Sequence, residues 1–292
     1  MKSKAMRKFG SLILAALLAG CAGAPTMQPP MLQPTAPGSI AAGKAEVLWL
    51  GQATIRITTP GGKVIVIDPW LTTNPKTPAE FKQLSALGKV DMILVTHAHY
   101  DHFFDAPALA KLNNVPVYNA GGMGPSIVSL GILPTALVQR FGKSGTVAPF
   151  GPTGPKITAV HAEHSSELVW KNPATDKDET HYGGEPVGYL IELENGFKIW
   201  HMGDTGLFGD MRLIGETYKP DLVLIPIGGH FTMGPQDAAI AVRDMIKPKY
   251  AIPFHYGTFP LLRGTPAEFI SALGPNSSTR VVVPEPGQKV DF

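Results

Sequence analysis

The sequence has 292 residues, of which 44% are hydrophobic and 16% are charged, enough for one large domain with a sizeable core. Its 32 glycines and 28 prolines favour a loop-rich α/β protein over a helical bundle, and no internal repeat is visible. A formal net charge of +2, with no basic patch interleaved with aromatic residues, gives no support to nucleic-acid binding.

The first twenty residues have the pattern of a signal segment. Basic residues come first, and the short apolar stretch 9–20 that follows is too short to span a bilayer comfortably. The next motif, Leu18-Ala-Gly-Cys21, resembles the lipobox of a bacterial lipoprotein, in which the cysteine is lipidated and becomes the mature first residue. We predict a signal peptide at 1–20 and a lipid anchor on Cys21. The alternatives are an ordinary secretory signal and an uncleaved anchor.

Removal of this signal would change the charge and the thiol chemistry of the chain. Cys21 is the only cysteine, so its lipidation leaves no thiol for a disulfide, a nucleophile or a metal ligand. The signal holds four of the 25 basic residues and none of the 23 acidic ones, which leaves 21 against 23, a net charge of −2. Residues 21–43 are rich in proline and carry no charged side chain, which predicts an extended tether ahead of a domain at 44–292. No aspartate follows Cys21, and by lipoprotein sorting rules this favours an outer-membrane anchor facing the periplasm.

The start of the predicted domain alternates apolar runs with turn residues. The runs predict strands at 46–50, 54–58 and 63–67. The third run ends in Asp68, which is either a turn residue or a carboxylate that orients a metal-binding histidine. Residues 78–87 predict a helix with Thr77 as its N-cap and Gly88 at its end.

The richest motif follows the apolar run 91–95, which predicts a buried strand. Four side chains able to bind a metal fall within six residues there: His97, His99, Asp101 and His102. In extended backbone His97 and His99 would project to the same side, whereas Asp101 and His102 can face a second point. The spacing therefore indicates two adjacent metal ions, and the alternative is a polar loop rich in histidine.

The middle of the chain supplies one further candidate ligand. Asp105 predicts the cap of a helix that runs to Leu112, and residues 115–118 predict a short strand. The glycine-rich segment 121–131 lacks the Lys-[Ser/Thr] ending of a phosphate-binding loop. A strand at 156–160 then leads to His161, interpreted as a packing or supporting residue, and to His164.

Residues 165–186 predict a long polar loop that could cover the metal site as a lid. His181 and Tyr182 on this loop are either substrate contacts or solvated residues. Asn195-Gly196 then predicts a tight hairpin between strands at 187–194 and 197–201, which leads to Asp204. The remaining predicted elements are a strand at 221–226, a helix at 235–246, a strand at 249–254 that leads to His255, a helix at 265–273 capped by Thr265, and a strand at 279–283.

The pattern H-x-H-x-D-H after a strand, followed in order by His164, Asp204 and His255, resembles the metallo-β-lactamase superfamily of metal-dependent hydrolases over roughly residues 45–292. The resemblance implies an α/β (α+β) fold, a four-layer αββα sandwich of two mixed β-sheets with helices outside and the site at one edge. A doubly wound parallel sheet is the alternative, weakened by the hairpin and by the absence of G-x-G-x-x-G.

The resemblance also implies a ligand set. His97, His99 and His164 would hold one metal, and Asp101, His102 and His255 the other, with Asp204 bridging. Nitrogen and oxygen ligands of this kind suit Zn²⁺ or Mn²⁺, with Fe as a further option. Two such ions can share a water and lower its pKa towards about 7, so the resulting hydroxide would be the nucleophile. With that hydroxide the site would carry a net charge near +1, which favours an anionic or electron-rich small-molecule substrate.

Three residues are predicted to act in catalysis: Asp101, Asp204 and His230. Asp101 could hydrogen-bond the nucleophile, and His230, in a glycine-rich loop, is the remaining candidate donor of a proton to the leaving group. The alternative for His230 is a loop histidine bonded to backbone.

Smaller motifs around Asp68, His164, 228–235 and 253–258 resemble the branch that contains the ascorbate-phosphate lactonases. We therefore expect a hydrolase of lactones or phosphodiesters at the bacterial envelope. The alternatives are a mononuclear iron oxygenase of the same fold and a non-enzymatic ligand-binding lipoprotein. The sequence leaves the oligomeric state open.

Overall fold

The computed structural model describes residues 43–292. The predicted signal peptide, Cys21 and all but the last residue of the predicted tether lie outside the described residues. Within the described part, every helix falls short of the length and hydropathy that a membrane span requires.

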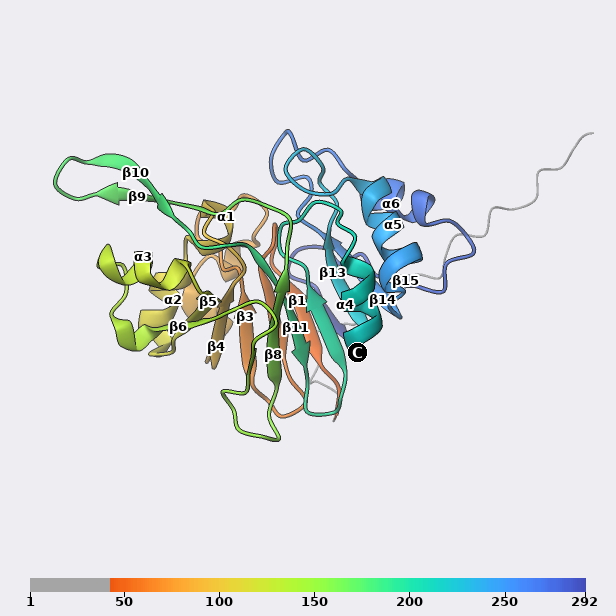
Figure 1. Cartoon of the computed structure of the whole chain (residues 1–292), viewed down its shortest axis with the longest axis horizontal. Coiled ribbons are helices and arrows are strands. Elements are labelled where there is room, and N and C mark those ends of the chain that lie inside the picture. The colour runs from red at the N-terminus through yellow and green to blue at the C-terminus, as the bar shows by residue number, and fades with distance from the viewer. Residues whose placement is uncertain (1–42) are drawn as a thin grey trace, which may run out of the picture.

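Two mixed β-sheets of seven strands each form the centre of the molecule (Figure 1). The first contains β1 (Glu46–Trp49), β2 (Ile55–Thr58), β3 (Val64–Ile67), β4 (Met92–Val95), β5 (Val117–Ala120), β6 (Val138–Phe141) and β16 (Lys289–Asp291). The second contains β7 (Thr146–Val147), β8 (Lys156–His161), β11 (Val187–Glu192), β12 (Lys198–His201), β13 (Leu222–Pro226), β14 (Tyr250–Phe254) and β15 (Arg280–Val281). Their orders are β16-β1-β2-β3-β4-β5-β6 and β15-β14-β13-β12-β11-β8-β7.

Each sheet is antiparallel in one half and parallel in the other. Strands β3 to β6 run parallel to one another, and so do β12 to β15. Because parallel strands end at the same edge of a sheet, the loops after β3 and β4 start together, as do those after β12 and β14. The segments after β4, β12 and β14 carry the predicted ligands other than His164, which follows β8.

The apolar faces of the two sheets pack against each other. The buried cluster between them contains Ile55 and Ile67 from the first sheet and Tyr189 and Leu224 from the second. Tyr189 also donates its hydroxyl to the carbonyl oxygen of Val95 at 2.7 Å. The end of β4 is thereby fixed against the second sheet.

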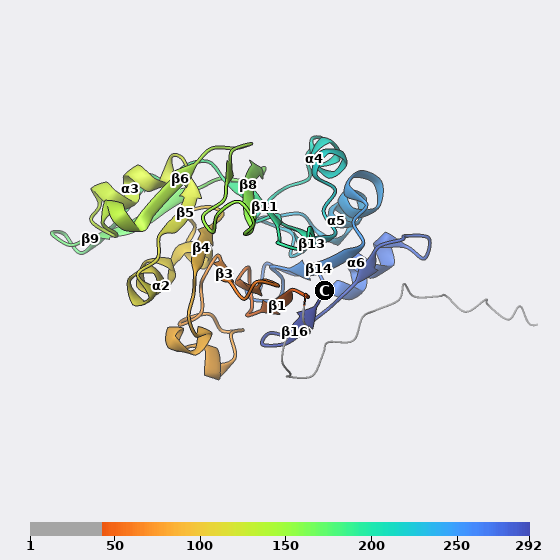
Figure 2. The ribbon, with the colours of Figure 1, turned by 90° about the horizontal axis from the view of Figure 1, so that it is seen from below.

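Helices cover the outer face of each sheet, and Figure 2 shows α2 and α3 on one side and α4 and α5 on the other. The first sheet carries α1 (Tyr100–Phe103), α2 (Ala106–Asn113), α3 (Met123–Ser129) and the 3₁₀ turns η1 (Ala79–Phe81), η2 (Leu84–Leu87) and η3 (Thr135–Leu137). The second carries α4 (Met211–Tyr218), α5 (Pro235–Ile240), the π-helical η4 (Ala241–Ile246) and α6 (Pro266–Leu273). The predicted four-layer αββα sandwich is confirmed, and the alternative of one parallel sheet is excluded.

The predicted helix at 78–87 is wrong. Two 3₁₀ turns, η1 and η2, occupy this segment, because Gln83 between them has extended backbone with ψ of 119°. Thr77 does not cap them, since its hydroxyl donates to the carbonyl oxygen of Leu50 at 2.7 Å. Gly88 follows η2, as predicted for the end of the segment.

The predicted polar loop at 165–186 is also wrong. It forms a separate two-stranded hairpin, β9 (Glu167–Asn172) and β10 (Lys177–Tyr182), which projects away from the sheets in Figure 1. The strand signal is the alternation of buried Leu168, exposed Val169 and half-buried Trp170. The hydroxyl of Ser126 on α3 donates to the carbonyl oxygen of Tyr182 at 2.6 Å. The hairpin is thus held against α3.

Two smaller predictions at helix ends had different outcomes. Asp105 precedes α2, but its carboxylate accepts from the backbone N–H groups of Leu71 and Thr72 instead of capping the helix. Thr265 caps α6 as predicted, in a reciprocal capping box with Glu268.

Candidate metal centre

The seven predicted ligands come together at one edge of the sandwich. Their metal-binding atoms form three overlapping groups, in each of which all atoms lie within 4.8 Å of one another. The groups are His97, His99 and His164; Asp101, His102 and His255; and His97, His102 and Asp204. The first two groups are the pair of sites expected from the sequence, and the third connects them.

Asp204 lies between the two sites. Its Oδ2 is 2.9 Å from Nε2 of His255 and 3.7 Å from Nε2 of His164, and its Oδ1 is 3.3 Å from Nε2 of His102. Oδ1 of Asp204 and Nε2 of His102 are both buried, and neither has a hydrogen-bond partner. Buried polar atoms without partners are costly, so an ion between these two atoms would satisfy both of them. This donor set therefore fits a metal.

The turn that presents Asp204 needs a glycine before it. Gly203 has φ of +64°, and a Cβ there would lie 2.9 Å from the carbonyl oxygen of Val187 and 3.0 Å from Cβ of Thr96. The buried His201 accepts the N–H of Gly203 at Nδ1 and donates from Nε2 to the carbonyl oxygen of Ala53. A histidine at the end of β12 thus fixes the turn.

The His164 loop is tied to the same turn. The N–H of Glu163 donates to the Thr205 hydroxyl at 2.9 Å, and the N–H of Gly206 donates to the carbonyl oxygen of Glu163 at 2.8 Å. These two bonds hold His164 beside Asp204, although forty residues separate them.

Asp68 holds the predicted ligand His102 in place. It is fully buried and has φ of +49°. Its Oδ1 accepts from the N–H of Thr96, and its Oδ2 accepts from the Thr96 hydroxyl at 2.6 Å and from Nδ1 of His102 at 2.8 Å. This contact leaves Nε2 of His102 free for a metal. The structure therefore places Asp68 as the carboxylate that orients a histidine.

Glu167 supports His99 in a similar way, and the sequence did not reveal it. Its Oε2 lies 2.9 Å from Nε2 of His99 and also accepts from the Ser165 hydroxyl. Nδ1 of His99 then faces Nε2 of His97 at 2.9 Å. The hydrogen bond from His99 lowers the pKa of Glu167. Glu167 stands at the start of β9 in a polar run, so no local pattern distinguishes it.

Gln52 is a second residue that the sequence did not reveal. It is fully buried with φ of +49°, in the turn between β1 and β2. Its Nε2 lies 2.7 Å from Oδ2 of Asp101, to which it donates, and 2.7 Å from Nε2 of His255. The N–H of His255 in turn donates to the carbonyl oxygen of Gln52. A single turn thus holds two of the three members of the second ligand group, Asp101 and His255.

Burial and neighbouring charges shift the pKa values of the ligands in different directions. Burial and the neighbouring His102 hold the pKa of His97 well below its usual value, which favours a neutral imidazole. Burial would lower the pKa of His255, but the carboxylates of Asp204 and Asp101 raise it to about 9. Burial would raise the pKa of Asp101, but His102 and His255 lower it to about 2. Without a metal, the second group is a network of charged hydrogen bonds.

The other predicted residues lie away from this cluster. His161 stacks edge-on against Phe208 and lies 3.2 Å from Glu163, so it packs at the surface. His181 faces Glu179 at 3.7 Å on the projecting hairpin. His230 has φ of +61° and lines a separate hollow with Arg263 and Glu268. Its role as a proton donor stays a prediction.

A pocket of about 330 Å³ opens onto the cluster. It is lined by His99, Asp101, His164, Ser165, Asp204, Phe231, His255 and Phe259. Its size is in the range of small-molecule sites.

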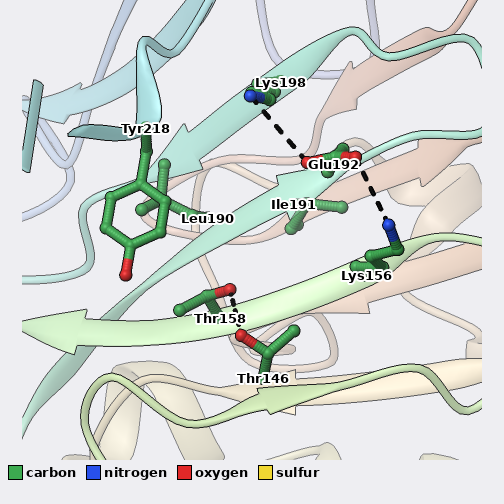
Figure 3. Close-up of a pocket in the computed structure, with 8 residues that line it drawn as sticks. All are labelled: Thr146, Lys156, Thr158, Leu190, Ile191, Glu192, Lys198 and Tyr218. Atoms are coloured by element: carbon green, nitrogen blue, oxygen red, sulfur yellow. Dashed lines mark hydrogen bonds and ion pairs between the residues drawn. The ribbon is translucent and has the colours of Figure 1, made fainter. Parts of the chain in front are cut away.

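Another hollow, shown in Figure 3, lies on the second sheet, where Glu192 pairs with both Lys156 and Lys198. Its charged groups are two lysines that share one carboxylate, with none of the clustered histidines and aspartates of the metal centre, so the metal cluster is the better candidate for chemistry.

Comparisons with known proteins identify the family and the fold of the chain. Residues 63–256 match the family model of the β-lactamase superfamily domain. The chain is 72% identical over 289 residues to a UPF0173 metal-dependent hydrolase of Cupriavidus necator, covering 98% of this chain and all of the relative. It is 46% identical over 227 residues to another of Rubrobacter xylanophilus, covering 78% and 88% of the two chains.

A solved structure shows the same fold. Igni18, a metallo hydrolase from the archaeon Ignicoccus hospitalis, superposes with a TM-score of 0.71 at 31% identity, covering 85% of this chain and 98% of that one. The chain thus belongs to the UPF0173 metal-dependent hydrolases, a family of the metallo-β-lactamase superfamily.

Proposed function

We propose that this metal-dependent hydrolase is dinuclear and cleaves a lactone or a phosphodiester at the bacterial envelope. The observation that carries the proposal is the position of Asp204, whose carboxylate lies 3.7 Å from His164 of one ligand group and 3.3 and 2.9 Å from His102 and His255 of the other. A carboxylate shared in this way suits two adjacent ions better than one.

The roles of the side chains follow from their contacts. His97, His99 and His164 would hold one ion, and Asp101, His102 and His255 the other. The set contains only nitrogen and oxygen donors, which suits Zn²⁺ or Mn²⁺. When bound, such ions supply a water of low pKa and polarise a substrate oxygen. Asp68, Glu167 and Gln52 hold three of the ligands in place, and the pocket provides room for a small substrate.

Metal quantification on the purified mature chain is the first test. We expect two equivalents of metal, together with hydrolysis of members of a lactone and bis-aryl phosphodiester panel that stops with a chelator and resumes when metal is restored. Asp204→Asn and His97→Ala should lower both metal content and rate. His181→Ala, on the projecting hairpin, is the matched control and should change neither. One equivalent of metal, or full activity in Asp204→Asn, would contradict the proposal.

The envelope location is a separate part of the proposal and rests on the amino-terminal sequence alone. Labelled fatty acid should enter the full-length chain but not Cys21→Ser, and the variant should leave the membrane fraction. An unchanged membrane fraction for Cys21→Ser would remove the lipid anchor from the proposal without affecting the hydrolase.

A further inference from the structure

Aromatic side chains form the wall of the metal pocket that faces solvent. Phe231 and Phe259 line the pocket beside the predicted ligands and remain 52% and 36% exposed. Exposed phenylalanines at the mouth of a pocket keep apolar surface in water, and this surface is removed from water only when a ligand covers it.

The wall is built on a stack of rings. Phe259 stacks on the buried indole of Trp70, with centroids 5.6 Å apart and planes at 15°. Tyr100 packs edge-on against the same indole at 5.5 Å. The indole N–H of Trp70 donates to the Thr73 hydroxyl, which lies 2.7 Å from the Tyr100 hydroxyl. The hydrogen bonds hold Trp70 and Tyr100 in place, so the surface under Phe259 is fixed in shape.

The charged residues of the pocket also favour an apolar substituent on the substrate. None of the described residues that line it is a lysine or an arginine. Arg263 lines a different hollow, where Glu268 accompanies it. A substrate with a phosphate group remote from its scissile bond would normally meet a basic side chain, because arginine and lysine are the usual partners of phosphate. This pocket offers such a group two phenylalanines instead.

We propose that the substrate carries an apolar acyl or aryl substituent that packs against Phe231 and Phe259. This inference rests on the proposed hydrolase and narrows its substrate class: a phosphate remote from the scissile bond is disfavoured, in a lactone or in a phosphodiester. Hydrolysis adds one water across the ester and gives an acid and a hydroxyl group, so no further reactant is needed. The apolar substituent contributes binding energy outside the reacting bond.

The direct test is a series of lactones that share one ring and differ in the length of a saturated side chain. Burial of each methylene should raise kcat/KM by about twofold to fourfold until the wall is covered. A lactone with a phosphate at the end of the same chain should be a poorer substrate than its uncharged partner. Equal kcat/KM along the series, or a preference for the phosphorylated compound, would overturn the proposal.

Variants separate the wall from the metal chemistry. Phe231→Ala and Phe259→Ala should raise KM for long-chain lactones about tenfold, and leave kcat, metal content and the short-chain substrate nearly unchanged. Tyr182→Ala is the matched control, because Tyr182 is 63% exposed but lies on the hairpin, outside the pocket lining. Equal KM values in the variants and the parent would contradict the proposal.

A binding measurement is independent of turnover. N-phenyl-1-naphthylamine, a neutral apolar fluorophore, should bind the full chain with or without metal, gain fluorescence on binding, and bind at least fivefold more weakly to Phe231→Ala. If probe binding is weakened as expected but no panel compound is hydrolysed by metal-loaded protein, the proposed reaction fails and the apolar site stands. If the variants lose affinity for phospholipid vesicles and keep their chain-length dependence, the wall contacts a membrane and the substrate proposal fails.

Discussion

Asp68 and His102 are joined by a 2.8 Å hydrogen bond between Oδ2 and Nδ1, in a place where both side chains are fully buried. The same Oδ2 accepts the hydroxyl of Thr96, at the end of β4. Asp68, the first residue after β3, thus fixes the position of a predicted ligand in the segment that follows β4. The parallel pairing of β3 and β4 makes this contact possible, because both strands end at the same edge.

Asp68→Asn should lower metal affinity by about 10- to 100-fold, because the amide can no longer accept from both Thr96 and His102 in the same way. Competition with a chromogenic chelator measures this. Asp105→Asn is the matched control, since Asp105 is a buried aspartate that accepts from Leu71 and Thr72, away from the ligands. It should lower Tm and keep metal affinity. Equal metal loss in both variants would show a general folding effect.

Glu167→Gln should have a smaller effect, confined to the group of His97, His99 and His164. Its carboxylate is half exposed, so the bond to His99 is partly screened by water. We expect less than a tenfold loss of affinity for one of the two ions, seen as two separate steps in a metal titration. Glu163→Gln, on the partly exposed pair with His161, is the control and should titrate like the parent. A uniform loss at both steps would contradict this assignment.

Gln52→Leu should weaken the other group. The amide of Gln52 holds Asp101 and touches His255, and leucine keeps the volume without the polar atoms. We expect about a tenfold loss at the second step of the same titration, the size of effect seen when a supporting contact to a metal ligand is removed. Gln236→Leu, at an exposed position on α5, should leave both steps in place. Retained affinity in Gln52→Leu would mean that its backbone contact with His255 is sufficient.

Gly203→Ala should misplace Asp204. A Cβ at this position meets Val187 and Thr96, and the left-handed backbone adds about 1–3 kcal/mol of strain. Gly196→Ala has the same kind of backbone, with φ of +81°, but open space around the added carbon. Both variants should lower the free energy of unfolding in urea, but only Gly203→Ala should lower metal content. Full metal content in Gly203→Ala would show that the turn can shift without moving Asp204.

The stabilisation by metal should grow as pH rises. In the metal-free protein the pKa of His255 is raised to about 9 from 6.5, so its contribution to stability is complete below pH 6.5 and is lost as pH rises through 9. Metal must displace this proton, and its affinity should increase by up to about tenfold per pH unit over the same range. The difference in Tm between metal-loaded and chelator-treated protein should therefore widen from pH 6.5 to pH 9. A constant difference would show that no proton is displaced.

The sequence by itself determined the kinds of side chains in the centre and the strands that carry them. This is because the H-x-H-x-D-H spacing and the apolar runs before His97, Asp204 and His255 are local patterns, each contained in a short stretch of the sequence. The same local rule missed the hairpin at 167–182, whose alternation is weak because most of its residues face solvent.

Only the tertiary structure decided how these ligands are held and what the pocket offers a substrate. Gln52, Asp68 and Glu167 each reach a ligand across 34 to 203 residues of chain. Phe231 and Phe259 meet at one pocket from separate loops. Contacts of this kind arise from the packing of two sheets, which places residues distant in sequence side by side, and no periodicity along the chain records them.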